Sequence, residues 1–170
     1  IAEEGRRQGY HSALREAGLS ADPKLEIAVN NEGKDCQTVG DLWDRCNPDG
    51  FFCFNDARAL YVYLQAARRG LYIGQDISVI GVDNHQVFAQ TLTPRLTTIG
   101  LPHYEMGYWA VSKVIDLIES DKEDLSGGQG SGGEEDELVS AAGIPMPSLD
   151  SVSPVRLYCP LIEKNSIVAG

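Results

Sequence analysis

The segment from Asp76 to Asn84, with the sequence DISVIGVDN, constrains the fold more than any other part of the chain. Its centre, Ile77 to Val82, is a continuous apolar run, and such a run is typical of a strand that is covered on both faces in a parallel sheet. A carboxylate, Asp83, follows directly. The segment therefore predicts an α/β protein whose sheet presents a polar group where this strand ends.

Helix and strand patterns alternate around this run. Apolar residues at helical spacing predict helices at Glu3–Ala17, Val39–Cys46, Leu60–Ala67 and Pro102–Glu119. Short apolar runs predict strands at Leu25–Asn30, Phe51–Phe54, Ile77–Val82 and Leu96–Ile99, with a final edge strand within Val155–Lys164. We expect the run at 51–54 to be fully buried. The order α-β-α-β-α-β-β predicts a doubly wound parallel sheet with right-handed crossovers.

Length and charge limit the class of protein. The 170 residues suffice for one sizeable core, so a second independent domain is not required. A formal charge of −11, from 25 acidic and 14 basic residues, repels phosphate backbones, so this piece is not expected to grip DNA itself. The chain carries neither a signal-like leader nor an apolar run of membrane-spanning length, which favours a cytoplasmic protein without a membrane partner.

Much of the negative charge lies in one segment. Residues 120–154 begin SDKEDLSGGQGSGGEEDE, and this composition predicts a disordered insertion. From Glu119 to Glu137 there are eight carboxylates and one lysine, a local charge of −7. The carboxylates lack the alternate-position spacing of an EF-hand loop, so we predict no metal site.

Two polar residues directly follow predicted strands. Asn55 follows the run at 51–54 and Asp83 follows the run at 77–82, so both should lie at one edge of the sheet, where open α/β folds bind ligands. An amide together with a carboxylate suits a polyol or a sugar. Asn55 could instead only cap a helix, and Asp83 could instead only form a turn. Arg6 and Arg7 could present a guanidinium to a ligand, or could simply be solvated.

Catalytic patterns are absent from the sequence. His11, His85 and His103 belong to no GxSxG elbow, HExxH pair or evident nucleophile–base set. No GxGxxG or GxxxxGK[ST] phosphate loop occurs either. We therefore predict a non-catalytic protein without a cofactor.

Three strings in this order and at matching separations carry a family resemblance: RRQGYHSALREAGL, FCFNDARALYVYLQAARRGLYIGQDISVIGVDN and TPRLTTIGLPHYEMG. The chain resembles the LacI/GalR family of bacterial transcription regulators, in the second half of their effector-binding core. The resemblance covers Gly5 to Leu117 and extends to Tyr158–Ser166. Within it, DISVIGVDN followed by TPRLTTI distinguishes regulators from periplasmic sugar-binding proteins of the same fold.

The resemblance implies a type I periplasmic-binding-protein fold, in which two subdomains clasp an effector behind a helix-turn-helix DNA-binding domain. Residues 1–99 with 155–168 would form the C-terminal subdomain, and residues 100–119 a helix of the first subdomain, which is otherwise absent from this chain along with the DNA-binding part. Residues 120–154 would be an insertion where the family has a short connection.

The resemblance also implies site residues. The arginine of the R-x-x-G element falls on Arg6, the asparagine of the N-D pair on Asn55, and the aspartate of the G-x-D element on Asp83. Two departures weaken any choice of effector, because Asp35 stands where an aromatic often stacks on the effector, and Leu101 stands where a polar residue is common. The family's dimers imply interface candidates at Leu60, Tyr61, Leu64 and Val87.

The leading hypothesis is thus the effector-binding domain of a repressor-like transcription regulator, which binds a sugar-like metabolite, forms a homodimer and biases operator binding. The alternative is a solute-binding receptor of the same fold. A hydrolase or transferase on a doubly wound sheet is a third possibility, but it would need a nucleophile or a phosphate loop that the sequence does not offer.

Overall fold

The computed structural model describes residues 2–29, 34–126, 143–150 and 155–168. The chain divides into two compact units. The first unit comprises Ile1–Gly100 together with Leu161–Gly170, and the second comprises Leu101–Pro160. The first unit is thus built from two stretches of sequence, one from each end of the chain.

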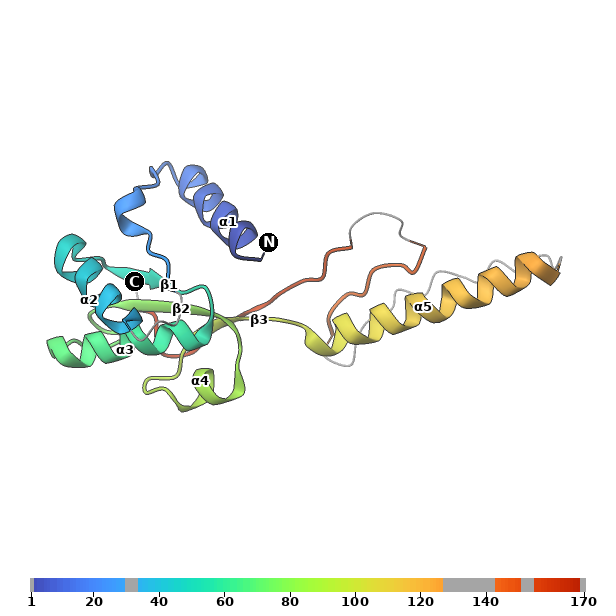
Figure 1. The fold of residues 1–170 in the computed structure, drawn as a ribbon. Coiled ribbons are helices and arrows are strands. Elements are labelled where there is room, and N and C mark those ends of the chain that lie inside the picture. The colour runs from blue at the N-terminus through green and yellow to red at the C-terminus, as the bar shows by residue number, and fades with distance from the viewer. Residues whose placement is uncertain (1, 30–33, 127–142, 151–154, 169–170) are drawn as a thin grey trace. The chain divides into compact units, whose positions relative to one another are not determined.

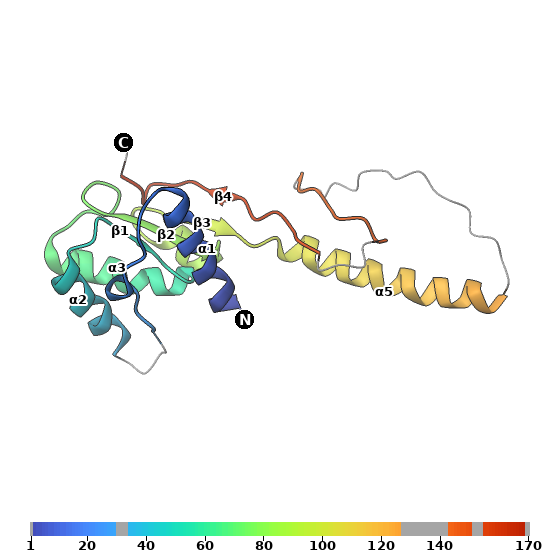
Figure 2. The same cartoon turned by 90° about the horizontal axis from the view of Figure 1, so that it is seen from above.

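The first unit is built on a four-stranded sheet in the order β1-β2-β3-β4 (Figures 1 and 2). Its strands are β1 (Gly50–Phe52), β2 (Ser78–Asp83), β3 (Thr97–Gly100) and β4 (Leu161–Ile162). β1, β2 and β3 are parallel, while β4 pairs antiparallel with β3. The predicted α/β fold with a mainly parallel sheet is confirmed, as is the edge position of the last strand.

Helices alternate with these strands. They are α1 (Ala2–Glu16), the 3₁₀ turn η1 (Pro23–Leu25), α2 (Asp35–Cys46), α3 (Asp56–Arg69) and α4 (Gln86–Thr91). α3 shows why the sequence starts and stops helices where it does. Asn55 caps its N-terminus by accepting a hydrogen bond from the Arg58 amide at 3.1 Å. Gly70 ends it in the left-handed region, with φ of 68°, where a glycine has no Cβ clash.

Helices cover both faces of the sheet. Figure 1 shows α3 and α4 on one side of the strands and α1 on the other. On the α3 side lies the core, a cluster of buried side chains formed by Val39, Trp43, Cys53, Ala59, Val62, Tyr63, Ala66, Ile73, Ile77, Val79 and Leu96. On the α1 side the rings of Tyr10 and Phe52 stack with centroids 6.3 Å apart. This two-sided cover is what a doubly wound sheet requires.

The predicted strand at Leu25–Asn30 is wrong for the described residues. Leu25 ends the 3₁₀ turn, residues 26–29 are irregular, and Asn30 lies outside the described residues. Ile27 is half-buried against the core cluster. The apolar pattern therefore reports burial of a side chain, which this segment achieves without joining the sheet.

The run at Phe51–Phe54 is shorter and more exposed than predicted. The strand covers Gly50–Phe52, and of the four predicted residues only Cys53 is buried. Phe52 and Phe54 retain 43% and 37% of their accessible surface. The reason is position, because β1 is the first strand in the sheet order and only its α3 side is covered by the core.

The second unit contains one long helix, α5 (His103–Ser126), which continues past the predicted end at Glu119. Residues 143–150 run beside it, since the Trp109 indole donates to the Pro147 carbonyl at 2.9 Å and Lys113 donates to the Leu149 carbonyl (Figure 2). The disorder predicted for 120–154 falls largely on residues 127–142 and 151–154, which lie outside the described residues. In the described part of the chain, no helix is long and apolar enough to cross a membrane.

Truncating a core side chain should destabilise the first unit. Leu96 is fully buried in the core cluster, so Leu96→Ala should lower the free energy of unfolding by about 2–5 kcal/mol through lost contacts and a residual cavity. Urea denaturation followed by circular dichroism measures the change. Leu19, which is 60% exposed, is the matched control, and Leu19→Ala should change the same free energy by about 0.5 kcal/mol or less. Equal losses in both variants would contradict this description of the core.

Candidate functional site

The parallel pairing of β1 and β2 places their carboxyl ends at one edge of the sheet. From this edge the chain leaves β1 through Phe54 and Asn55, and β2 ends at Asp83. We call this end of the sheet, where the parallel strands have their carboxyl ends, the rim. In open α/β sheets ligands bind outside the carboxyl ends of the strands, so the rim is the first place to look for a site.

Arg6 reaches the rim from α1 and is held there by Phe54. Its Nη1 donates to the Phe54 carbonyl oxygen at 2.7 Å, and its guanidinium carbon lies 4.4 Å from the centre of the Phe54 ring. A guanidinium over an aromatic face is stabilised by the ring quadrupole. The two contacts fix a cation beside the end of β1.

Arg6 also faces the carboxylate at the end of β2. Its Nη2 lies 3.5 Å from Asp83 Oδ1, and the two side chains are 23% and 29% exposed. That distance is at the long limit of a hydrogen bond. The pair is therefore close enough to be attractive yet loose enough for both groups to bind a polar ligand.

Asn55 stands next to this pair, with its side-chain oxygen already in use. That oxygen accepts the Arg58 amide as the α3 cap, so the amide NH₂ is the group that can donate to a ligand. Among the described contacts, none joins the Asn55 side chain to Arg6 or Asp83. The structure thus brings two of the three predicted site residues into contact and places the third directly after Phe54.

Arg7 points elsewhere and anchors α1. Its Nε donates to Glu26 Oε2 at 2.8 Å, and His11 Nε2 lies 2.7 Å from Glu26 Oε1. The hydrogen bond from Arg7, followed by that from His11, lowers the pKa of Glu26 below its ordinary value of 4.5. The ion pairs tie α1 to the segment after η1, and so hold the helix that carries Arg6.

A buried carboxylate that is not among the predicted site residues lies directly behind the rim. Asp56 follows Asn55 and is fully buried. Its Oδ2 accepts the His85 backbone amide at 2.7 Å, and its Oδ1 accepts the Thr98 hydroxyl at 2.6 Å. Burial raises the pKa of Asp56 despite these hydrogen bonds. The sequence offered one signal for Asp56, its place in the N-D pair. An acidic residue is also favoured at any helix N-terminus, so this signal did not point to a role at the site.

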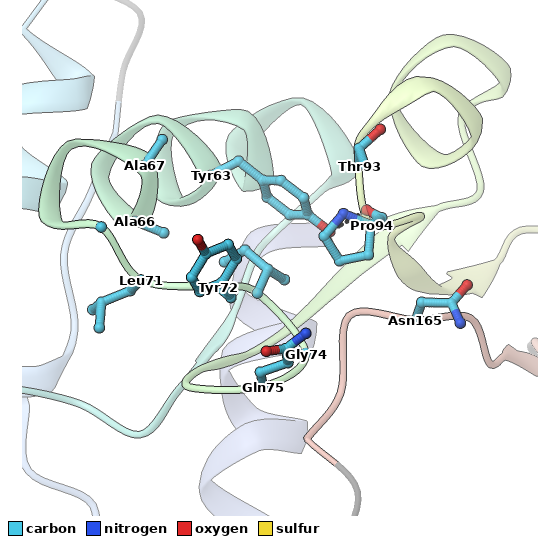
Figure 3. Close-up of a pocket in the computed structure, with 12 residues that line it drawn as sticks. Tyr63, Ala66, Ala67, Leu71, Tyr72, Gly74, Gln75, Thr93, Pro94 and Asn165 are labelled. Carbon is cyan, nitrogen blue, oxygen red and sulfur yellow. Dashed lines mark hydrogen bonds between the residues drawn. The ribbon is translucent and has the colours of Figure 1, made fainter.

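A cavity of about 690 Å³ occurs elsewhere in the first unit (Figure 3). It lies beyond the C-terminus of α3 and before β2 and β3, at the opposite end of the parallel strands from Asp83. Its walls are Tyr63, Ala66, Ala67, Gly70, Leu71, Tyr72, Ile73, Gly74, Gln75, Thr93, Pro94 and Asn165. The Tyr63 hydroxyl donates to the Pro94 carbonyl at 2.9 Å across one side. None of the predicted site residues lines this cavity, so we do not assign the effector site to it.

Metal binding finds no support in the described ranges. Within them, no three His, Cys, Asp or Glu side chains are grouped so that they could hold a metal ion. Arg6, Asn55 and Asp83 offer one cation, one amide and one carboxylate. This set suits hydrogen bonding to a polar organic molecule better than coordination of a cation.

Comparison with known proteins finds a matching family and related sequences. Residues 2–127 match the profile of the family described as "Periplasmic binding protein-like domain". The HTH-type transcriptional repressor CytR of Escherichia coli (strain K12) is 36% identical over 118 residues, which are 67% of this chain and 34% of CytR. The HTH-type transcriptional regulator DegA of Bacillus subtilis (strain 168) is 39% identical over 109 residues, 62% of this chain and 31% of DegA. The chain thus spans about a third of the length of these curated relatives.

A solved structure gives the same fold. A LacI family transcriptional regulator from Enterococcus faecium, with bound ribose, superposes with a TM-score of 0.67 at 22% identity. The match covers 97% of this chain and 51% of that one. It supports the arrangement of sheet and helices described above.

The anchor of α1 should depend on pH in a defined direction. Because the pKa of Glu26 is lowered in the folded chain, its contribution to stability is present above its ordinary pKa and is lost as the pH falls through the folded value. Glu26→Gln should therefore lower Tm at about pH 7, and the difference from the natural chain should shrink as the pH falls below 4.5, the ordinary pKa of the group. Thermal denaturation monitored by circular dichroism across this range measures it. A difference that grows on acidification would contradict the assignment, and Glu163→Gln, at an exposed position, serves as the control.

Proposed function

Since the chain belongs to the family of periplasmic binding protein-like domains and is homologous to LacI-family repressors, we propose that it binds a small polar effector, most simply a sugar, at the rim. In this proposal Arg6, Asn55 and Asp83 contact the effector. The chain performs no chemistry on it, as the regulators among its relatives suggest. Effector binding instead changes the operator affinity of a larger regulator.

The observation that carries the proposal is the convergence of Arg6 and Asp83 at the carboxyl edge of the sheet. Arg6 donates, Asp83 accepts, and the Asn55 amide group adds a further donor. Adjacent hydroxyls on a sugar ring can satisfy all three groups at once. The ribose in the Enterococcus faecium structure is a ligand of this kind.

Only part of a clamp is supplied by this chain. We infer that a first subdomain, supplied by a part of the protein outside this sequence, closes over the rim and packs on α5. Exposed apolar side chains on α5 support this inference; they include Val111, Val114, Ile115, Leu117 and Ile118, each 50–61% exposed. An effector held between two subdomains favours the closed arrangement by its differential affinity, and this preference is what a distant DNA-binding domain would sense.

The remaining partners follow from the same proposal. A helix-turn-helix domain outside this sequence would contact DNA, in keeping with the names of CytR and DegA, and the protein would act in the cytoplasm. The strongly negative charge of this chain, −11, is consistent with DNA contact through another domain.

The effector site can be tested with a thermal-shift screen of D-ribose, other simple sugars and nucleosides on the complete protein, in which the proposed first subdomain is present. A ligand that binds only the folded state raises Tm. Asp83→Ala should weaken binding of the sugar that gives the shift by about 1.5–3 kcal/mol, the range for hydrogen bonds to a charged group, as measured by calorimetry. Asp49→Ala is the matched control, because Asp49 is an exposed aspartate at the opposite edge of the sheet. Unchanged affinity in Asp83→Ala would remove Asp83 from the site.

We further propose that two copies associate through α3 and α4, which pack against each other. Leu64 and Val87 suit this role, with exposed fractions of 44% and 58%. Leu60 and Tyr61 are half-buried, and Tyr61 packs partly against the core, so both also serve the fold.

Leu64→Asp should disrupt the dimer, because a carboxylate buried in an interface loses its hydration without gaining a partner. Sedimentation velocity should show a dimer for the natural chain and a dimer Kd raised by at least about tenfold in the variant. Leu19→Asp, at an exposed site on neither helix, should leave the distribution unchanged. A natural chain that sediments as a monomer at micromolar concentration would contradict the proposal.

A further inference from the structure

The turn that carries Asp83 has an unusual backbone. Asp83 and Asn84 have φ angles of 113° and 50°, which fall in the region that side chains other than glycine rarely adopt. Such conformations persist only where the surrounding structure determines them, and they cluster at ligand sites. The contacts that hold this turn therefore decide where the Asp83 carboxylate points.

Three hydrogen bonds from three separate segments hold the turn. The His85 amide donates to Asp56 Oδ2 at 2.7 Å, and the Asn84 amide donates to Thr98 Oγ1 at 3.2 Å. Lys164 Nζ donates to Asn84 Oδ1 at 3.1 Å. The two backbone amides that follow Asp83 are thus fixed from α3 and from β3, and the Asn84 side chain is held from the segment after β4.

Asp56 is the centre of this arrangement. One oxygen of Asp56 accepts the His85 amide, and the other accepts the Thr98 hydroxyl at 2.6 Å. Asp56 therefore also orients Thr98, whose hydroxyl oxygen holds the Asn84 amide. β2 leaves room for it, because a Cβ at Gly81 would lie 2.2 Å from Asp56 Oδ1. Asp56 also immediately follows Asn55. One buried carboxylate therefore connects the positions of two predicted ligand contacts.

We propose that Asp56 is a positioning residue for the effector site, which sets the Asp83 carboxylate and the Asn55 amide in their binding geometry without touching the effector. The role of the site itself rests on the proposed function. The positioning of the turn by Asp56 does not depend on the proposed function.

The chemistry of the side chain explains why a carboxylate stands here. Burial penalises its charge and raises its pKa, whereas an amide of the same shape would avoid that penalty. An ionised carboxylate, however, accepts at both oxygens, and the structure uses both. In Asp56→Asn one of these acceptors becomes an NH₂ donor, so either the His85 amide or the Thr98 hydroxyl loses its partner.

Hydrogen exchange measured by NMR on the full chain tests the positioning without any ligand. Asp56→Asn should raise the exchange rate of at least one of the His85 and Asn84 amides by at least about tenfold beyond the change in global stability, because either His85 loses its acceptor or Thr98, which holds Asn84, loses its own. Val62→Ala is the control, a buried truncation in the same helix, and it should change those two amides only in step with the rest of the core. The proposal is overturned if Asp56→Asn also changes both exchange rates only in proportion to the change in global stability.

A second variant keeps the test decisive if Asp56→Asn folds poorly. Thr98→Val keeps the shape of a buried side chain but removes both the donor to Asp56 and the acceptor for the Asn84 amide. It should deprotect the Asn84 amide, which loses its acceptor, and also the His85 amide, because Asp56 loses the hydroxyl that orients its carboxylate. Normal protection of Asn84 and His85 in a folded Thr98→Val chain would overturn the proposal.

Calorimetric titration with D-ribose, or with whichever sugar raises Tm, separates this proposal from the proposed function. Asp56→Asn should weaken the binding of that sugar by at least about tenfold, with Val62→Ala within about twofold of the natural chain. Equal losses in the two variants would overturn the positioning role. If the complete protein binds no sugar or nucleoside, the proposed function fails, while the exchange experiment still decides whether Asp56 holds the turn.

Discussion

The packing of α3 across the sheet is the interaction on which the rest of the first unit depends. Ala59, Val62 and Ala66 of this helix are at most 2% exposed and belong to the cluster that also buries Val79 of β2. α3 connects β1 to β2 and brings them side by side in the same direction. The carboxyl ends of both strands therefore meet at the rim, and the positions of Asn55 and Asp83 follow from that alignment.

Buried and partly buried charged groups behind the rim hold its polar side chains in place. Asp56 stays buried because a backbone amide and a hydroxyl satisfy its oxygens, and Lys164, in the segment after β4, adds a nearby cation. Arg6 arrives from α1, whose own anchor is the Glu26 ion-pair cluster. The candidate site thus combines segments from both ends of the sequence, and its geometry depends on interactions behind the ligand-facing side chains.

The ends of the sheet differ in a way that fits a binding module. One end presents Arg6, Asn55 and Asp83, while the other holds a cavity beside Tyr63 and Pro94 with none of those groups. α5 in the second unit contrasts with α3, because its apolar side chains are exposed among the described residues. An exposed apolar helix and an open polar rim are both features that a closing first subdomain would cover.

Local patterns in the sequence determined helices α1, α2, α3 and α5, the strand at Ile77–Val82 and the choice of Asn55 and Asp83 as candidates, but not α4 or η1, because apolar periodicity, caps and strand ends are set by neighbouring residues. The segment at 25–29 shows the limit of such patterns, since Ile27 packs against the core without a strand and Leu25 stays 44% exposed. The spacing left Arg6 and Arg7 open and the resemblance pointed to Arg6, but only the tertiary structure showed that Arg6 reaches the rim, that Phe54 supports it, and that Asp56 holds the turn after β2. These contacts join residues 19 to 77 positions apart, and no local propensity encodes a distance of that kind.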